Sequence, residues 1–174
     1  PQGYVGVHLR FNKVIGTMQS GLNMRLPMMD DVVPMSIQTQ KYEAKATAAS
    51  KDLQDVTASI AINYKLDPDR IAEIYSTIGI HYIEVIAMPL EQEVVKEITA
   101  RFNAEDMIIK RPEVKDAITL ELKKRLAERG IITETVNITN FDFSPEFTKA
   151  IEAKVVAIQK VLEAENRLRK VEVE

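Results

Sequence analysis

The sequence predicts an α+β fold in which a mixed, mostly antiparallel sheet carries helices on one face and is followed by a long helix. Three observations support this prediction. Strand-like alternation dominates the first third of the chain, helical spacing begins at Pro68 and gives way to a closing strand over 131–143, and residues 146–174 contain neither glycine nor proline. Strands first, helices in the middle and a last strand are typical of helices packed on one face of a sheet.

The clearest strand lies within residues 50–66. Apolar residues alternate there with polar or small ones, and this period of two indicates a strand with one buried face: Val56, Ala58, Ile60, Ile62, Tyr64 and Leu66. A polar turn, Ser50-Lys51-Asp52, precedes the strand. Asp67 and Pro68 follow it and are typical of the cap and first position of a helix.

Shorter alternating segments predict more strands before residue 50. Residues 3–11 and 13–17 form a pair joined at Asn12, which tolerates turn geometry. Residues 21–27 and 35–47 are predicted as a third and a fourth strand.

Two methionines between these segments, Met28 and Met29, allow two interpretations. Methionine is flexible and adapts to irregular surroundings, so the pair fills a gap in the core or lies in a surface turn. Alternatively, the pair forms a soft apolar patch that presses onto lipid.

Helical spacing dominates the middle of the chain. Ile71, Ile74 and Ile78 share one face of the first helix, which Gly79 ends. We expect Met88-Pro89 to interrupt the next helix, because proline lacks the backbone donor. The predicted helical segments are 68–79, 89–102, 104–109 and 112–130.

A closing strand is predicted over residues 131–143. Ile132, Val136 and Ile138 are expected on one face, and Phe141 and Phe143 indicate a bulge or bend.

The last segment is predicted to be a separate element, so we divide the chain into a globular domain, 1–144, and a helix, 145–174. Ser144 is suited to the N-cap and Pro145 to the first helical position. One helix over these residues extends roughly 45 Å, at about 1.5 Å per residue.

Apolar residues of this helix recur at heptad spacing, which indicates a coiled coil. The positions predicted to mediate oligomerisation are Ala150, Ile151, Ala157, Ile158, Val161, Leu162, Leu168 and Val171. Residues 147–158 either pack on the sheet or join the coiled coil, and self-association is favoured beyond Val161. About three heptads are present, so we expect the chain alone to be monomeric or weakly associated and a longer parent to form a large oligomer.

Composition excludes several classes of protein. The 174 residues are 45% hydrophobic and 28% charged, which is typical of a globular protein. A net charge of −3 argues against a nucleic-acid partner, because such binding depends on clustered Lys and Arg. The absence of cysteine excludes disulfides, thiol catalysis and thiolate-ligated metals.

Catalytic motifs are missing as well, so we predict no enzyme activity, no cofactor and no metal. His8 and His81 belong to no metal-binding spacing, and the sequence has neither a G-x-S-x-G elbow nor a phosphate-binding loop. Ser50 and Lys51 are adjacent, and neighbours on a strand point to opposite faces, so they do not form a catalytic pair.

No run of 18 apolar residues occurs, so no membrane-spanning helix is predicted within the sequence. Because the first residue is proline and not methionine, we expect these residues to be an excerpt of a longer protein.

Three segments together resemble the SPFH (band 7, PHB) superfamily of stomatins, prohibitins and flotillins, and the prohibitins most closely. They are SKDLQDVTASIAINYKLDP, IYSTIGIHYIEVIAMPLEQEVVKEITARFNAEDMIIKRPEVKDAI and RGIITETVNITNFDFSPEFTKAIEAKVVA. The similarity extends in order from about Gly3 to the end of the chain.

The resemblance implies a membrane-associated, non-catalytic scaffold that forms rings or cages and organises membrane microdomains. It also implies an N-terminal membrane anchor that these residues do not include. Its partners would be further copies or a related subunit, and membrane lipid. The alternative is a regulatory adaptor or chaperone that restrains a membrane-anchored AAA protease or another client. Under either hypothesis we expect Tyr4, Val5, Met28 and Met29 to face the membrane.

Overall fold

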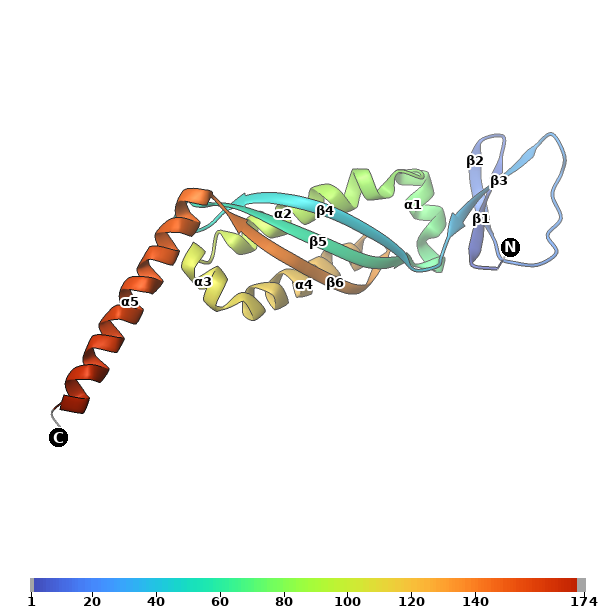
Figure 1. Cartoon of the computed structure of the whole chain (residues 1–174). Helices are drawn as coiled ribbons and strands as arrows, with labels where there is room; N and C mark the ends of the chain where they lie inside the picture. The colour runs from blue at the N-terminus through green and yellow to red at the C-terminus, as the bar shows by residue number, and fades with distance from the viewer. Residues whose placement is uncertain (1, 172–174) are drawn as a thin grey trace.

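The computed structural model describes residues 2–171, and the side chains of residues 2–164. The molecule is elongated (Figure 1). A small sheet lies at one end, a second sheet with its helices forms the middle, and the last helix projects from the opposite end.

The N-terminal sheet is antiparallel. Its strands are β1 (Tyr4–Arg10), β2 (Lys13–Met18) and β3 (Asp30–Ser36), in the order β2-β1-β3. Phe11 and Asn12 make the tight turn between β1 and β2 with φ angles of 50° and 65°. The predicted hairpin with its turn at Asn12 is therefore confirmed.

The predicted strand over residues 21–27 is wrong, because residues 19–29 form a long loop. The side chains of residues 21–27 are all exposed, so no buried face stabilises a strand there. The side-chain amide of Asn23 donates to the backbone carbonyls of Gln19 and Gly21, at 2.8 and 3.4 Å. Met28 has a φ of 76°, which is typical of a turn. The loop thus satisfies part of its backbone locally.

The second sheet contains β4 (Gln40–Ala49), β5 (Asp55–Leu66) and β6 (Ile131–Phe143), in the order β4-β5-β6. All strand pairs of both sheets are antiparallel, so the predicted mostly antiparallel pairing is confirmed, whereas the single mixed sheet is wrong because the strands form two separate sheets. The segment predicted as one strand over 35–47 is divided between the two sheets. Ser36 accepts a hydrogen bond from the Gln38 amide at 3.3 Å, a local turn that ends β3 before β4 begins.

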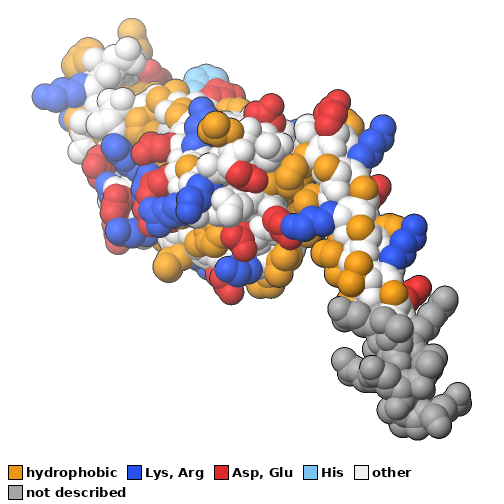
Figure 2. All heavy atoms as spheres, turned by 90° about the vertical axis from the view of Figure 1, so that its left-hand side faces the viewer, with side chains coloured by type: hydrophobic (Ala, Val, Ile, Leu, Met, Phe, Trp, Pro, Cys, Tyr) orange, Lys and Arg blue, Asp and Glu red, His pale blue; other side chains and the backbone are white. Residues whose placement is uncertain are grey.

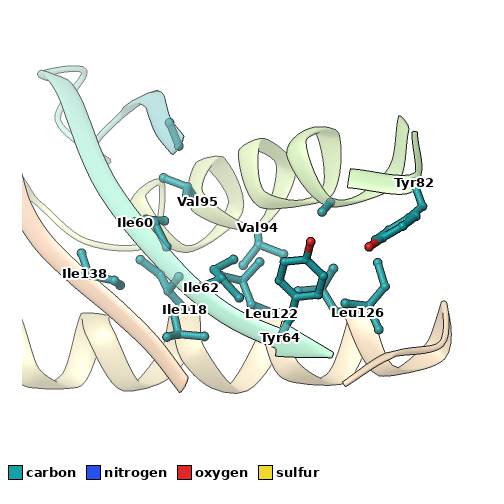
Figure 3. Packing of buried hydrophobic residues seen from close by; sticks show 14 of the residues in the cluster. Ile60, Ile62, Tyr64, Tyr82, Val94, Val95, Ile118, Leu122, Leu126 and Ile138 are labelled. Carbon is teal, nitrogen blue, oxygen red and sulfur yellow. The ribbon is translucent and has the colours of Figure 1, made fainter. Parts of the chain in front are cut away.

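The central strand β5 alternates as predicted. Every second residue from Val56 to Leu66 is buried. These side chains point toward the helices on one face of the sheet, as Figure 3 shows for Ile60, Ile62 and Tyr64.

The closing strand β6 follows the prediction only in part. Its pairing with β5 skips a residue at Thr139 and another at Glu134, which are bulges. Each bulge reverses which side chains of β6 face inward. Val136 and Ile138 are buried as expected, whereas Ile131 takes the inward position predicted for Ile132. The bulge predicted near Phe141 is confirmed, and Ile132 is exposed because of the second, unpredicted bulge.

The helices are the short 3-10 turn η1 (Pro68–Arg70), α1 (Ile71–Thr77), the π turn η2 (Ile83–Ala87), α2 (Met88–Thr99), α3 (Ala104–Ile109) and α4 (Arg111–Glu128). Helix α2 packs on β4 and α4 packs on β6, so these two cover one face of the second sheet, as predicted. Helix α1 contacts β1 and β2 of the N-terminal sheet. Figure 3 shows Val94 and Val95 of α2 and Leu122 of α4 meeting the residues of β5.

The predicted interruption at Met88-Pro89 is wrong. The Met88 amide donates to the carbonyl of Ile83, five residues before it, and α2 continues through Pro89. A wider π turn directly before proline accommodates the ring and the missing donor without ending the helix.

The last helix, α5 (Pro145–Val171), begins where the sequence predicts. The amide of Phe147 donates to the Ser144 hydroxyl at 3.2 Å, which is the expected cap. From there α5 extends away from the body (Figure 1).

Candidate functional surfaces

The residues considered for catalysis have structural roles. The Ser50 hydroxyl donates to Asp52 at 2.7 Å, and Asp52 accepts the Ala104 amide at 2.9 Å. The hydrogen bond from Ser50 lowers the pKa of Asp52, and the Ala104 amide adds to this. The turn at Ser50 therefore caps α3 and is not a Ser-Lys pair, since Lys51 is exposed.

Metal-binding clusters are absent from the part of the chain that the structure describes: no three His, Cys, Asp or Glu side chains are grouped to hold an ion. His8 lies 3.2 Å from Asp30, and His81 lies 2.9 Å from Glu84 on an exposed surface.

One titratable group is buried in the core. Glu91 of α2 is 1% exposed. Burial raises the pKa of its carboxyl to about 7, an effect that the Tyr42 hydroxyl on β4 partly offsets. The protonated carboxyl is therefore the main form at this position below about pH 7.

The first candidate surface is the apical loop, which we define as residues 19–29 between β2 and β3. Leu22, Met24 and Met28 are fully exposed, and Leu26 is about half exposed. Phe11, in the neighbouring turn between β1 and β2, is exposed too. Apolar side chains therefore gather at the end of the molecule that lies farthest from α5 (Figure 1).

A buried carboxylate fastens this loop at its base. Asp30 accepts hydrogen bonds from Arg10 Nε at 2.7 Å, Arg10 Nη2 at 3.2 Å and the Leu26 amide at 2.8 Å. The bond from Arg10 is the main reason why the pKa of Asp30 lies far below its ordinary value. The Phe11 amide also donates to the Met29 carbonyl at 3.0 Å, so the loop is held in one position against β1.

The four residues predicted to face a membrane differ in how far their side chains are exposed. Met28 is fully exposed, and Tyr4 and Met29 are partly exposed. Val5 is only 5% exposed because it belongs to the inward face of β1, so its assignment to the membrane-facing set is wrong. The prediction missed Leu22 and Met24, because it assigned them to a strand. Gly21 and Pro27, on either side, are turn residues that could have indicated a loop.

The second candidate surface is the apolar side of α5. Ile158, Val161 and Leu162 are about half exposed, Ala150 and Ala157 are exposed, and Ile151 is partly buried. Leu168 and Val171 lie outside the described side chains. Figure 2 shows apolar side chains along the described part of this helix, with Lys and Glu between them.

The first turns of α5 pack against the body. The rings of Phe143 and Phe147 lie 5.3 Å apart, and Lys154 forms an ion pair with Glu105 of α3 at 2.8 Å. Beside these contacts is a cavity of about 370 Å³, which we call the neck groove. Its lining consists of Met107, Ile108, Arg111, Phe141, Asp142, Phe143, Phe147, Thr148, Ile151 and Glu152.

Among the described residues, no helix is both long enough and apolar enough to span a bilayer.

Comparison with known proteins places the chain in a family. Residues 1–172 match the SPFH domain / Band 7 family. "Mitochondrial prohibitin complex protein 1" of Caenorhabditis elegans is 32% identical over 161 residues, which are 92% of this chain and 58% of that protein. "Prohibitin-1, mitochondrial" of Arabidopsis thaliana is 30% identical over 168 residues, 94% of this chain and 58% of the relative.

A mammalian relative shows the same extent of similarity. "Prohibitin-2" of Mus musculus is 31% identical over 160 residues, 89% of this chain and 54% of the relative. The chain thus spans about half the length of the curated relatives it matches. The resemblance seen in the strand motif at Ser50 and in the two longer segments is confirmed, and the chain belongs to the SPFH domain / Band 7 family.

Proposed function

We propose that the protein is a non-catalytic, prohibitin-like membrane scaffold that docks on lipid at one end and assembles with further copies, or with a related subunit, at the other. The observation that carries this proposal is the position of the two exposed apolar surfaces. The apical loop and the apolar side of α5 lie at opposite ends of the molecule (Figure 1).

The apical loop is suited to the membrane interface. Large exposed apolar side chains in one loop are a recognised mark of a membrane or protein contact. Burying such a side chain contributes roughly 1.5–3 kcal/mol, so Leu22, Met24 and Met28 together supply reversible docking. The hydrogen bonds that Asp30 accepts from Arg10 and the Leu26 amide, which we call the latch, support this role. A loop held in one position loses less conformational entropy on docking.

The apolar side of α5 is suited to assembly. An isolated helix is only marginally stable in water, and an apolar face gains stability by packing against a partner. Many copies joined in this way, with their apical loops on one side, would form a ring or cage on the membrane and delimit a microdomain.

The second candidate function is an adaptor that binds and restrains a membrane-anchored AAA protease or another client. The neck groove is the feature that favours a protein contact on the body itself, because it is concave, largely apolar and beside exposed Ile108.

A flotation experiment tests the proposed membrane contact. We expect the protein to float with phosphatidylcholine and phosphatidylglycerol vesicles, and the triple variant Leu22→Ser, Met24→Ser, Met28→Ser to lose most of this binding. Leu120→Ser is the matched control, because Leu120 is 72% exposed on α4, away from the loop. Equal flotation of the triple variant and the wild type would contradict the proposal.

A further inference from the structure

We propose that the neck groove is a docking site for helix α5 of a second copy of this chain. The inference rests on the proposed assembly and goes further, because it assigns part of the interface to the globular body. Assembly through α5 alone would leave the groove uninvolved.

The groove has the size and lining of a side-chain receptor. It lies between α3, β6 and the first turns of α5, with Phe141, Phe143 and Phe147 in its wall and fully buried Met107 as its floor. A volume of about 370 Å³ admits a few side chains. Ile108 on its rim is 46% exposed, although it is apolar and lies beside an aromatic cluster.

The groove continues directly into the apolar side of α5. Ile151 lines the groove, and Val155, Ile158 and Leu162 follow it at four, seven and eleven residues, which is one face of a helix. Groove and helix therefore form one apolar strip, which begins in the body and extends along α5. A single helix lying along this strip would cover both parts.

The occupant that fits this strip is a helix with an apolar face of its own, and α5 meets that requirement. The larger apolar side chains of α2 and α4 point mainly into the core, as Figure 3 shows for Val94, Val95 and Leu122. Among the described helices, α5 is the one whose recurrent apolar face has no covering element. In helix pairs of this kind, a side chain of one helix enters a gap between four residues of its neighbour.

Charges on the rim agree with this occupant. Arg111, Asp142 and Glu152 line the groove. The outer turns of α5 carry Lys160 and Glu163 beside the apolar face, so charges of both signs are present on both surfaces. Complementary flanking charges favour one alignment of paired helices over others.

The first test is a charge placed on the rim. Ile108→Glu in the protein as its host cell makes it should weaken self-association at least tenfold, measured by sedimentation velocity in mild detergent. Leu120→Glu is the matched control and should assemble like the wild type. Both positions are exposed in the single chain, so both variants should fold, which circular dichroism checks.

The second test uses the absence of cysteine from these 174 residues, because a disulfide between two positions within them must then come from an introduced pair. Two differently tagged chains, one with Ile108→Cys and one with Val155→Cys, are made in the same cells and oxidised. We expect a disulfide that joins the two tags. Leu120→Cys, paired with Val155→Cys, should form none.

The outcomes separate this inference from the proposed function. If Ile108→Glu assembles normally and the mixed disulfide fails to form, the groove lies outside the interface and the inference is overturned, while assembly through α5 still stands. If charges on α5 itself also leave the particle size unchanged, the proposed assembly fails as well.

Discussion

The second sheet and the apical loop use apolar residues in opposite ways. In the second sheet, β5 buries every second residue from Val56 to Leu66 beneath α2 and α4. In the N-terminal sheet, the loop between β2 and β3 exposes Leu22, Met24 and Met28, and a charged latch at Asp30 holds it in place. Burial thus stabilises the middle of the molecule, whereas polar contacts hold an apolar surface in place at its end.

The largest expected effect comes from the core. Leu122 is fully buried between α4 and the sheet, so Leu122→Ala should lower the free energy of unfolding by about 3–4 kcal/mol, through lost burial and the cavity left behind. Met28→Ala, at a fully exposed position, should change it by less than about 0.5 kcal/mol. Urea titration measures both, and comparable losses at the two sites would contradict the distinction between the core and the apical loop.

A smaller effect is expected at Glu91, the carboxyl in the core. The pKa of the Glu91 carboxyl is raised to about 7 in the folded protein. The contribution of this group to the free energy of unfolding is therefore fully present below the ordinary carboxyl pKa of about 4.5, and it is lost as the pH rises through 7. Glu91→Gln removes this titration. The variant should therefore gain stability over the wild type between pH 5 and pH 8, on the order of 1–3 kcal/mol at the upper end.

Thermal unfolding at several pH values measures this gain. A difference between Glu91→Gln and the wild type that stays constant with pH would show that the buried carboxyl is not the cause. Glu93→Gln is the matched control, because Glu93 lies on the exposed side of the same helix and forms an ion pair with Arg125 at 2.9 Å.

The latch should have a local effect. Asp30→Asn removes the charge that binds Arg10 and weakens acceptance of the Leu26 amide, so the apical loop should lose its fixed position. We expect hydrogen exchange of the amides in residues 19–29 to become about tenfold faster, while those of β5 stay protected. Because the pKa of Asp30 is strongly lowered, the wild-type latch should persist on acidification until the pH falls well below 3.8.

Asp31→Asn is the control for this prediction, since Asp31 is the exposed neighbour on β3. Unchanged exchange in the loop of Asp30→Asn would show that other contacts hold it.

The fold was predictable where one physical cause dominated. The alternation from Val56 to Leu66 indicates a strand with one buried face, and Ser144 indicates the start of a helix. The structure confirms both predictions. The strand β6 was harder, because the bulge at Glu134 depends on pairing with β5 and moves Ile131, not Ile132, into the core. No local sequence pattern indicates such a skipped residue.

The candidate surfaces were predictable only in outline. Met28 was expected at the surface and is there, but Val5 is buried, because the side chains of β1 alternate and its inward set is the apolar one. The segment that contains Leu22 and Met24 has a composition typical of a strand, and only the structure shows that this segment pairs with no other strand. The neck groove combines residues from α3, β6 and α5, which are distant in the sequence, so it could not be inferred before the fold was known.

The central claim is that the two ends have separate roles, and sedimentation velocity of the protein as its host makes it, in mild detergent, tests this most directly. The double variant Ile158→Glu, Val161→Glu places charges on the apolar side of α5 and should reduce a large particle to small species. The triple serine variant of the apical loop should keep the full particle size. The same large particle in the α5 variant, or a dissociated particle in the loop variant, would contradict the account.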